Sequence, residues 1–341
     1  MTEERVVVIG ASAGGVEALQ RFVPSIGPDF PAPLFVVVHI PAEAPSLLAS
    51  VLQRKTKARV EEAADGVRWE NGVIYVAAAD RHLVLEDGRI RATRGARENR
   101  HRPAIDPLFR SAALHFGPGV IAVVLTGSLD DGTGGAITVK QHGGKVVVQD
   151  PNEASYASMP STVLEHVDVD AVVKIDELGT ALKRMIGSPV TKQRLERDDA
   201  LSLEVGMAKL DSKALEEEKR PGHPSAYSCP DCGGVLWEIN DAGEYTRYRC
   251  RVGHAFSPET MISAQGEQLE EALWSAVKTL EETVRLSRRL AAAERLRGHD
   301  WMAERFDEKE REAAARAETI RRVLIRVDTV PVEAPATREA M

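Results

Sequence analysis

The sequence predicts an α/β fold in which a doubly wound, mostly parallel sheet has helices on both faces and is followed by a small cysteine-containing unit and a helical hairpin. Three observations predict it. Short β-branched runs alternate with helical patterns over residues 1–187, all three cysteines lie within residues 229–250, and a stretch rich in Ala, Glu, Arg and Leu follows from residue 263. Because 43% of the 341 residues are hydrophobic, the chain can bury more than one core, which argues against a disordered or fibrous protein.

The first 187 residues carry the predicted sheet. Its strands are expected at five short apolar runs, residues 6–9, 34–38, 73–76, 120–125 and 145–148. These runs are continuously apolar, which is typical of strands buried on both faces. Helical patterns at residues 16–23 and 107–115 lie between them, so the sheet is expected to be parallel and covered by helices. Residues 59–93 alternate more and contain Glu86-Asp87-Gly88, which predicts a local antiparallel hairpin.

The rest of the chain divides by composition. Residues 188–222 are rich in charge and end at Pro221-Gly222, which predicts a charged linker. Residues 223–262 hold every cysteine and are too few to fold on apolar burial alone, so they need a cross-link such as a bound metal. Residues 263–326 are predicted to form a helical hairpin interrupted at Gly298, and residues 327–341 a disordered tail.

Charge and hydropathy exclude several partners. The chain has 44 lysines and arginines against 52 aspartates and glutamates, a net charge of −8, so no DNA partner is expected. No apolar stretch reaches the roughly 18 residues that a membrane helix needs, so no membrane insertion is expected. The first residues do not resemble a signal peptide, and the sequence therefore predicts a cytoplasmic protein.

The first predicted strand runs directly into Gly10-Ala11-Ser12-Ala13-Gly14-Gly15 and then into a helical pattern. A dinucleotide-binding turn would need glycine where Ser12 stands, and an acidic residue at the end of a second strand. A nucleophile elbow instead needs a serine lifted above the sheet between small neighbours, with the amides of Ala13 and Gly14 serving as an oxyanion hole. A glycine-rich turn with a serine N-cap is the structural alternative.

A serine nucleophile needs a base and an orienting carboxylate. His39 follows the second predicted strand, at the edge where the elbow would lie if the two strands are parallel neighbours. Asp130 and Asp131 follow the strand that ends near residue 125, and either could instead be a turn residue. Taken alone, a histidine that closes an aliphatic strand is more often structural than catalytic.

The motifs taken together resemble the catalytic domain of CheB-type chemotaxis methylesterases. The resemblance covers residues 5 to about 187 in order, and it rests on Gly10-Ala11-Ser12-Ala13-Gly14-Gly15, Val38-His39-Ile40-Pro41, Tyr75-Val76-Ala77, Asp80-Arg81-His82-Leu83, Arg102-Pro103-Ala104-Ile105-Asp106, Leu108-Phe109-Arg110-Ser111, Leu125-Thr126-Gly127, Asp131-Gly132, and Gln149-Asp150-Pro151 through Met159-Pro160.

The resemblance implies a protein-glutamate methylesterase acting on a methylated chemoreceptor or a related signalling protein. It implies Ser12 as nucleophile, His39 as general base and then acid, and Asp131 as the orienting carboxylate, because the family places its aspartate directly before a glycine. Relatives also deamidate receptor glutamines. Family members often have threonine and methionine where this chain has Ala13 and Ser128, so any oxyanion contribution at these positions is expected from backbone amides.

The resemblance also bears on regulation. The first strand begins at Val6, so the phosphorylated receiver domain usual in relatives is not expected upstream. Activation is then expected from a partner, from the C-terminal half, or not at all. The alternative function is a degenerate esterase domain that serves as a non-catalytic regulatory or interaction module.

The cysteines form a metal-ligand pattern. Cys229 and Cys232 are separated by two residues, seventeen residues follow, and Cys250 and His254 are separated by three. Thiolates and imidazole at this spacing suit tetrahedral Zn²⁺, and four protein ligands predict a structural ion in a small zinc ribbon, with no cofactor for catalysis. His223 is a competing fourth ligand, and two reduced cysteines with a coincidental third are the structural alternative.

Two features near the cysteines have less specific interpretations. Arg247, Arg249 and Arg251 form a basic strip that suits either nucleic acid or a solvated face. The helical stretch after the ribbon spaces its apolar residues by three or four, which predicts either an intramolecular hairpin or a homodimer contact, and a monomer in light scattering would remove the dimer; the residues are Leu269, Leu273, Ala276, Leu280 and Val284.

Overall fold

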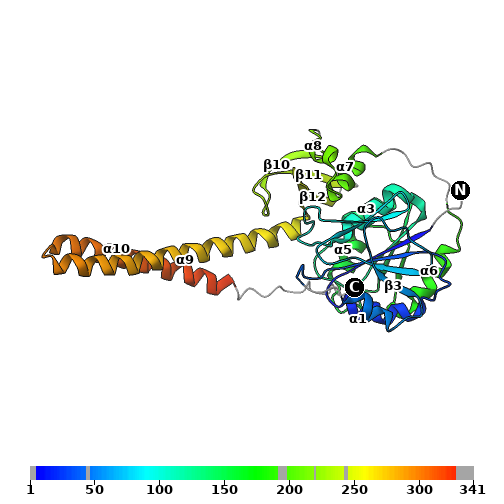
Figure 1. The fold of residues 1–341 in the computed structure, drawn as a ribbon, viewed down its shortest axis with the longest axis horizontal. Coiled ribbons are helices and arrows are strands. Elements are labelled where there is room, and N and C mark those ends of the chain that lie inside the picture. The colour runs from blue at the N-terminus through cyan, green and yellow to red at the C-terminus, as the bar shows by residue number, and fades with distance from the viewer. Residues whose placement is uncertain (1–4, 44–46, 191–197, 219, 242–244, 328–341) are drawn as a thin grey trace, which may run out of the picture. The chain divides into compact units, whose positions relative to one another are not determined.

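The computed structural model describes residues 5–43, 47–190, 198–218, 220–241 and 245–327 (Figure 1). The chain divides into two compact units, residues 1–262 and residues 263–341. The predicted tail lies, from residue 328 on, outside the described residues.

A seven-stranded, fully parallel sheet forms the centre of the first unit, as predicted. The strand order is β3-β4-β2-β1-β7-β8-β9, so β2 lies on one side of β1 and β7 on the other. The strands are β1 Val6–Ala11, β2 Leu34–Val38, β3 Arg59–Glu62, β4 Val73–Val76, β7 Val120–Val124, β8 Lys145–Gln149 and β9 Ala171–Val173. The chain thus builds the sheet outward from β1 in both directions. In open α/β sheets, ligands bind where this change of direction occurs, beyond the carboxyl ends of the central strands.

Helices cover both faces of this sheet. The helices are α1 Gly15–Phe22, α2 Leu48–Gln53, α3 Ile105–Phe116, α4 Thr133–Gln141, α5 Ser158–His166 and α6 Leu178–Ile186, with short 3₁₀ turns η1 Val23–Ser25, η2 Gly117–Gly119 and η3 Ile175–Glu177. Val6 and Val8 of β1 pack with α3, α4 and α5, whereas Val7 and Ile9 pack with α1, α2 and α6. Figure 1 shows α3 and α5 on one side of the strands and α1 on the other. Burial on both faces explains why the strands read as continuous apolar runs.

The predicted antiparallel hairpin is present as β5 His82–Glu86 and β6 Arg89–Thr93. Asp87 and Gly88 connect them, and both have positive φ, 47° and 75°. A two-residue turn with two positive φ angles matches the twist of the paired strands, and Asp-Gly adopts it readily.

The structure differs from the sequence prediction over residues 188–222. The described part of the predicted charged linker contains two helices, α7 Asp199–Ala208 and α8 Ser212–Glu216. Leu201, Val205 and Ala208 form one buried face of α7 against Val84 of β5. The buried face of α7 also includes a charged residue, Glu204. The sequence of α7 therefore lacks the purely apolar stripe by which a buried helix is normally predicted.

Residues 223–256 form a four-stranded antiparallel sheet within the first unit. Its strands are β10 His223–Ser228, β11 Val235–Asp241, β12 Tyr245–Cys250 and β13 Ala255–Phe256. β11 and β12 pair antiparallel from Leu236 with Cys250 to Asp241 with Tyr245, which agrees with the predicted small ribbon. We call residues 223–256 the ribbon.

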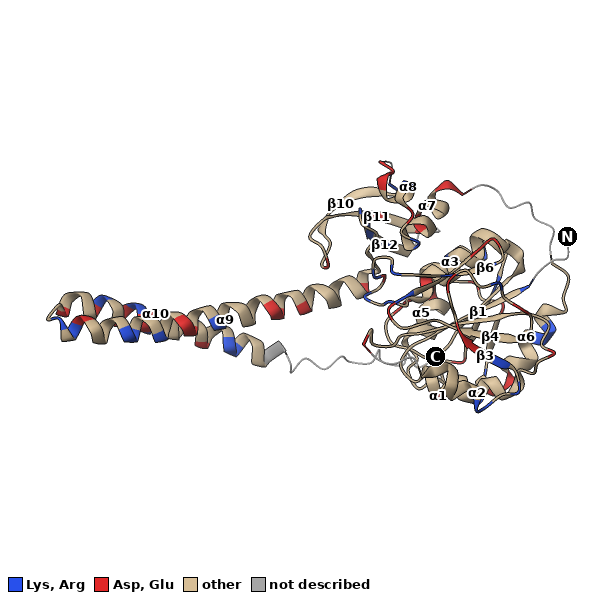
Figure 2. Cartoon of the chain, in the orientation of Figure 1, with Lys and Arg blue, Asp and Glu red and all other residues tan. Residues whose placement is uncertain are grey.

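The second unit is an antiparallel helical hairpin, and α9 Pro258–Leu296 and α10 Asp300–Val327 supply its helices. Its core consists mainly of small side chains, among them Ala291, Ala303, Ala313 and Ala317. Ion pairs join the two helices, for example Arg288 to Glu310 at 2.7 Å, and Figure 2 shows charges of both signs along both helices. The intramolecular hairpin is thus present, and Leu269 of the predicted seam is 58% exposed. No helix in the described part of the chain is both long and apolar enough to span a membrane.

Candidate active site

Ser12 lies in a tight turn between β1 and α1. The Ser12 amide donates to the Thr126 carbonyl at 3.0 Å, and the Ser12 carbonyl accepts from the Gly15 amide at 2.9 Å. Gly14 has φ 73°, and a Cβ on Gly15 would come within 2.6 Å of the Ala11 Cβ, so the turn requires both glycines. Gly14 is the N-cap of α1, without a side-chain cap, so the serine N-cap interpretation is wrong.

His39 lies one residue beyond β2, and its backbone amide donates to the Ala11 carbonyl at 3.3 Å. Its Nδ1 is 3.0 Å from Ser12 Oγ, and its Nε2 is 2.7 Å from Asp131 Oδ2. A carboxylate can only accept a hydrogen bond, so Nε2 carries the imidazole proton. Nδ1 is then free to accept the proton of the Ser12 hydroxyl.

Asp131 is 2% exposed and accepts hydrogen bonds at both carboxylate oxygens. Oδ2 accepts from His39 and from the Ile105 amide at 2.7 Å. Oδ1 accepts from Asn99 Nδ2 at 2.8 Å and from the Asp106 amide at 3.3 Å. Burial opposes ionisation, but the hydrogen bonds from His39, Ile105 and Asn99 hold the pKa of Asp131 below its usual range. The carboxylate is therefore ionised and fixed in place beside the imidazole.

The structure separates the two candidate aspartates. Asp130 accepts from the Tyr245 hydroxyl at 3.0 Å and from Ser257 Oγ at 2.7 Å, both outside the α/β sheet. Burial raises the pKa of Asp130 to about 6. Only Asp131 contacts His39, and the sequence alone left this choice to the family resemblance.

His101 also belongs to the site, although it follows no predicted strand. Its ring stacks on that of His39, with the centroids 3.6 Å apart and 12° between the planes. Burial, and then the neighbouring His39, lower the pKa of His101 to about 4, so the ring is neutral at pH 7. Nothing in the sequence predicted that Asn99 would contact Asp131. No spacing rule marks either residue, because each reaches the site through the fold of the loop before α3.

The predicted oxyanion donors lie on two loops. Among the described residues, the amides of Ala13 and Gly14 have no hydrogen-bond acceptor in the protein, so they are available to a ligand. Thr126 Oγ1 donates to the Ala13 carbonyl at 3.0 Å and so orients this peptide. Ser128 is exposed on the loop after β7, and its contribution stays a prediction.

The α/β part of the chain is similar to known proteins. Residues 7–182, half of the chain, match the family described as CheB methylesterase. The chain belongs to the CheB methylesterase family. The α/β part also resembles the crystal structure of the Thermotoga maritima CheB methylesterase catalytic domain, with a TM-score of 0.51 and 34% identity over 53% of this chain and 98% of that one.

Among similar proteins, one from Leptospira interrogans, named a putative protein-glutamate methylesterase/protein-glutamine glutaminase, is 34% identical over 52% of this chain and 93% of its own length. Protein-glutamate methylesterase/protein-glutamine glutaminase 2 from Anaeromyxobacter dehalogenans is 37% identical over 53% of each chain. This chain thus covers about half the length of the latter. The residues after the CheB methylesterase match include α7, α8, the ribbon and the hairpin.

The four predicted metal ligands converge beside the CheB methylesterase domain. The ligand atoms of Cys229, Cys232, Cys250 and His254 all lie within 4.8 Å of one another. Cys232 Sγ is 3.7 Å from Cys250 Sγ, close to the edge of about 3.8 Å that a tetrahedron with Zn–S bonds of about 2.3 Å would have. His223 lies outside this cluster, on β10 opposite Glu238. Three thiols and one imidazole fit Zn²⁺ and leave no open position.

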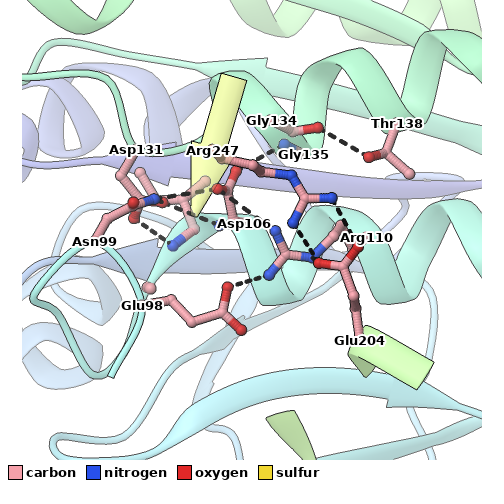
Figure 3. A network of polar contacts seen from close by, with 12 residues as sticks. Glu98, Asn99, Asp106, Arg110, Asp131, Gly134, Gly135, Thr138, Glu204 and Arg247 are labelled. Carbon is pink, nitrogen blue, oxygen red and sulfur yellow. Dashed lines mark hydrogen bonds and ion pairs between the residues drawn. The ribbon is translucent and has the colours of Figure 1, made fainter. Parts of the chain in front are cut away.

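Two arginines of the predicted basic strip, Arg247 and Arg249, are buried and therefore do not form a solvated face. Arg247 Nη2 pairs with Glu204 Oε1 at 2.7 Å, and Arg249 Nη2 pairs with Glu98 Oε2 at 2.9 Å, with all four side chains buried. Figure 3 shows Arg247 reaching Glu204 beside Arg110 of α3. The alternating arginines of β12 thus face acids of the CheB methylesterase domain and of α7, and only Arg251 is exposed.

Proposed function

We propose that this chain hydrolyses glutamate γ-methyl esters on chemoreceptors or related signalling proteins. The observation that carries the proposal is the continuous relay from Ser12 Oγ through His39 to Asp131, within a domain of the CheB methylesterase family. Both hydrogen bonds of the relay have the lengths that proton transfer needs.

Acylation uses each member of the relay once. His39 Nδ1 takes the proton of the Ser12 hydroxyl as Oγ forms a bond to the ester carbonyl carbon. The carbonyl oxygen becomes an oxyanion, and the free amides of Ala13 and Gly14 at the start of α1 can donate to it. His39 then gives its proton to the methoxy oxygen, the carbon–oxygen bond breaks, and methanol leaves.

Deacylation repeats these steps with water. His39 takes a proton from the water as its oxygen attacks the acyl carbon, and Ser12 Oγ leaves with that proton. The product is a receptor glutamate carboxylate. Asp131 accepts the Nε2 proton throughout, which fixes the tautomer and stabilises the transient imidazolium.

The same site supports a second reaction, deamidation of receptor glutamines. Attack of Ser12 on a side-chain amide would give the same acyl-enzyme with ammonia as the leaving group. The relatives named above carry both activities in their names.

We further propose that Zn²⁺ binds Cys229, Cys232, Cys250 and His254 as a structural ion. The closed set of four ligands supports this role, and none of the four residues contacts the relay. When bound, the ion would cross-link the two loops of the ribbon. Catalysis then uses no cofactor.

The domain bounds and partners complete the proposal. We assign residues 1–187 to the esterase, 223–262 to the zinc-binding region and 263–326 to the hairpin. The protein is expected to be cytoplasmic and to meet its substrate at the cytoplasmic side of a receptor. A homodimer through the hairpin is also proposed, because the hairpin exposes apolar residues such as Leu269 and Trp274.

Methanol release from methylated receptor membranes tests the proposed activity. We expect wild-type protein to release methanol and Ser12→Ala to release only the background amount, a loss of at least about 10³-fold. Ammonia released in the same assay from unmodified receptor measures deamidation. Equal methanol release by wild type and Ser12→Ala would favour the alternative, a non-catalytic interaction module.

A further inference from the structure

The ribbon contacts the loops that hold the relay aspartate. We call residues 255–260, which lead from β13 into α9, the exit segment. The Asn99 amide donates to the Ala255 carbonyl at 2.7 Å, and the Ala255 amide donates to the Arg97 carbonyl at 3.3 Å. The exit segment therefore pairs with the loop before α3. All of these residues belong to the first compact unit.

The Asn99 side chain bridges the exit segment and Asp131. Its Nδ2 donates to Asp131 Oδ1 at 2.8 Å and to Asp106 Oδ2 at 3.1 Å, a contact visible in Figure 3. Its Oδ1 accepts from the Ser257 amide at 3.1 Å and lies 3.3 Å from Thr260 Oγ1. Asn99 is 3% exposed, so these contacts decide which way its amide faces.

A second route runs through Asp130. Its Oδ1 accepts from Ser257 Oγ at 2.7 Å, and its Oδ2 accepts from the Tyr245 hydroxyl at 3.0 Å. Asp130 directly precedes Asp131 in the loop before α4. Both oxygens of this neighbouring carboxylate are thus bound by side chains of β12 and the exit segment.

We propose that Tyr245, Ser257 and Thr260 are positioning residues of the esterase, acting through Asn99 and Asp130 to hold Asp131 against His39. This inference rests on the proposed function and extends it, because these residues lie beyond the part of the chain that matches the CheB methylesterase family.

The physical reason lies in the symmetry of a carboxamide. Its oxygen and its NH₂ group have nearly the same shape, so only hydrogen-bond partners distinguish the two orientations. Donors from the exit segment bind the oxygen, which leaves the NH₂ group facing Asp131. Without these donors, a flipped amide would place its oxygen against the ionised carboxylate, and Asp131 would lose one hydrogen bond and move away from His39.

Conservative variants of the full chain test this inference. Tyr245→Phe removes only the hydroxyl that binds Asp130, and Thr260→Val removes the hydroxyl near Asn99 while keeping the side-chain shape. We expect each to lower kcat for methanol release about tenfold with KM unchanged. Thr260→Ser keeps the hydroxyl and should restore most of the lost kcat.

Two matched controls separate positioning from general damage to the ribbon. Tyr248→Phe removes a hydroxyl from the same strand as Tyr245, and Thr246→Val removes a hydroxyl that donates to Asn240. Both are expected to keep the wild-type kcat. Asn99→Asp should lower kcat at least as much as Thr260→Val, and adding Thr260→Val to Asn99→Asp should have little further effect, because both act through one side chain.

Proton NMR supplies a readout that needs no turnover. The Nε2 proton shared by His39 and Asp131 should give a far-downfield imidazole resonance, assigned by its loss in His39→Gln. We expect this resonance to shift or broaden in Tyr245→Phe and Thr260→Val and to stay in place in both controls.

The outcomes distinguish this inference from the proposed function. Wild-type kcat and an unchanged resonance in both Tyr245→Phe and Thr260→Val would overturn the positioning role. If wild-type protein releases no more methanol than Ser12→Ala, the proposed function fails, and the resonance alone then decides whether the ribbon holds Asp131.

Discussion

At the scale of single residues, the site depends on which protonation state each buried group holds. Asp131 is ionised because it accepts several hydrogen bonds, whereas burial and the nearby Asp131 raise the pKa of Asp106 to about 7. His101 is kept neutral and lies flat on His39, where a second positive charge would oppose formation of the imidazolium. Groups that lie close together in the site thus titrate in different pH ranges.

The neutral state of His101 predicts how stability depends on pH. Its pKa is about 4 in the folded protein and about 6.5 in the unfolded chain, so between these values only the unfolded chain binds a proton. Acidification from pH 7 to about pH 5 should therefore lower the free energy of unfolding, by about 2 kcal/mol from this group.

Urea unfolding of wild type and His101→Phe checks this sign. Phenylalanine keeps a stacking ring without a titrating group, so the variant should lose less stability on acidification than the wild type. Asp106 and Asp130 have raised pKa values and act in the opposite direction in both proteins, and they therefore cancel in the comparison. Parallel losses in the two proteins would contradict the prediction.

At the scale of elements, tight turns bring the site residues to the ends of the central strands. Ser12 follows β1, His39 follows β2 and Asp131 follows β7, and these three strands are neighbours in the sheet. Gly14 and Gly132, with φ 73° and 97°, allow helices to begin directly after the loops that carry Ser12 and Asp131. In the ribbon, the turns after β10 and after β12 likewise bring together the four candidate metal ligands, Cys229, Cys232, Cys250 and His254.

Metal binding at the ribbon is predicted to depend on His254 and not on His223. Full-length wild type should contain one zinc per chain by elemental analysis, and His254→Ala should lose most of it, because a fourth ligand is removed from a closed site. His223→Ala is the matched control and should keep its zinc. A loss in His223→Ala with retention in His254→Ala would reverse the ligand assignment.

At the scale of the whole molecule, buried ion pairs join the ribbon and α7 to the α/β domain. Arg249 binds Glu98 with both terminal nitrogens, and Arg110 of α3 pairs with the same carboxylate. Arg247 binds Glu204 in a similar way. Taking such charges out of water is costly, so each depends on its partners for compensation.

Removal of one partner should therefore cost considerable stability. Arg249→Met leaves Glu98 buried with one cation fewer, and we expect the free energy of unfolding to fall by about 3 kcal/mol. Arg251→Met, at an exposed position two residues later, should change it by less than about 0.5 kcal/mol. Chemical denaturation measures both, and equal effects in the two variants would show that the buried pair contributes little.

The sequence by itself determined the parallel sheet, the tight turn at Ser12, the metal-ligand spacing and the helical hairpin, whereas the catalytic roles of Ser12 and His39 were predicted from the resemblance to the CheB-type family. Each of these depends on local spacing, on apolar runs or on motifs that lie within one short segment. It could not reveal α7, the bridging role of Asn99, the stacking of His101 or the burial of Arg247 and Arg249. Those features arise where segments that are separate in the sequence pack together, as Glu98 does with Arg249, 151 residues away. In such contacts the partner's charge decides whether a polar side chain is buried.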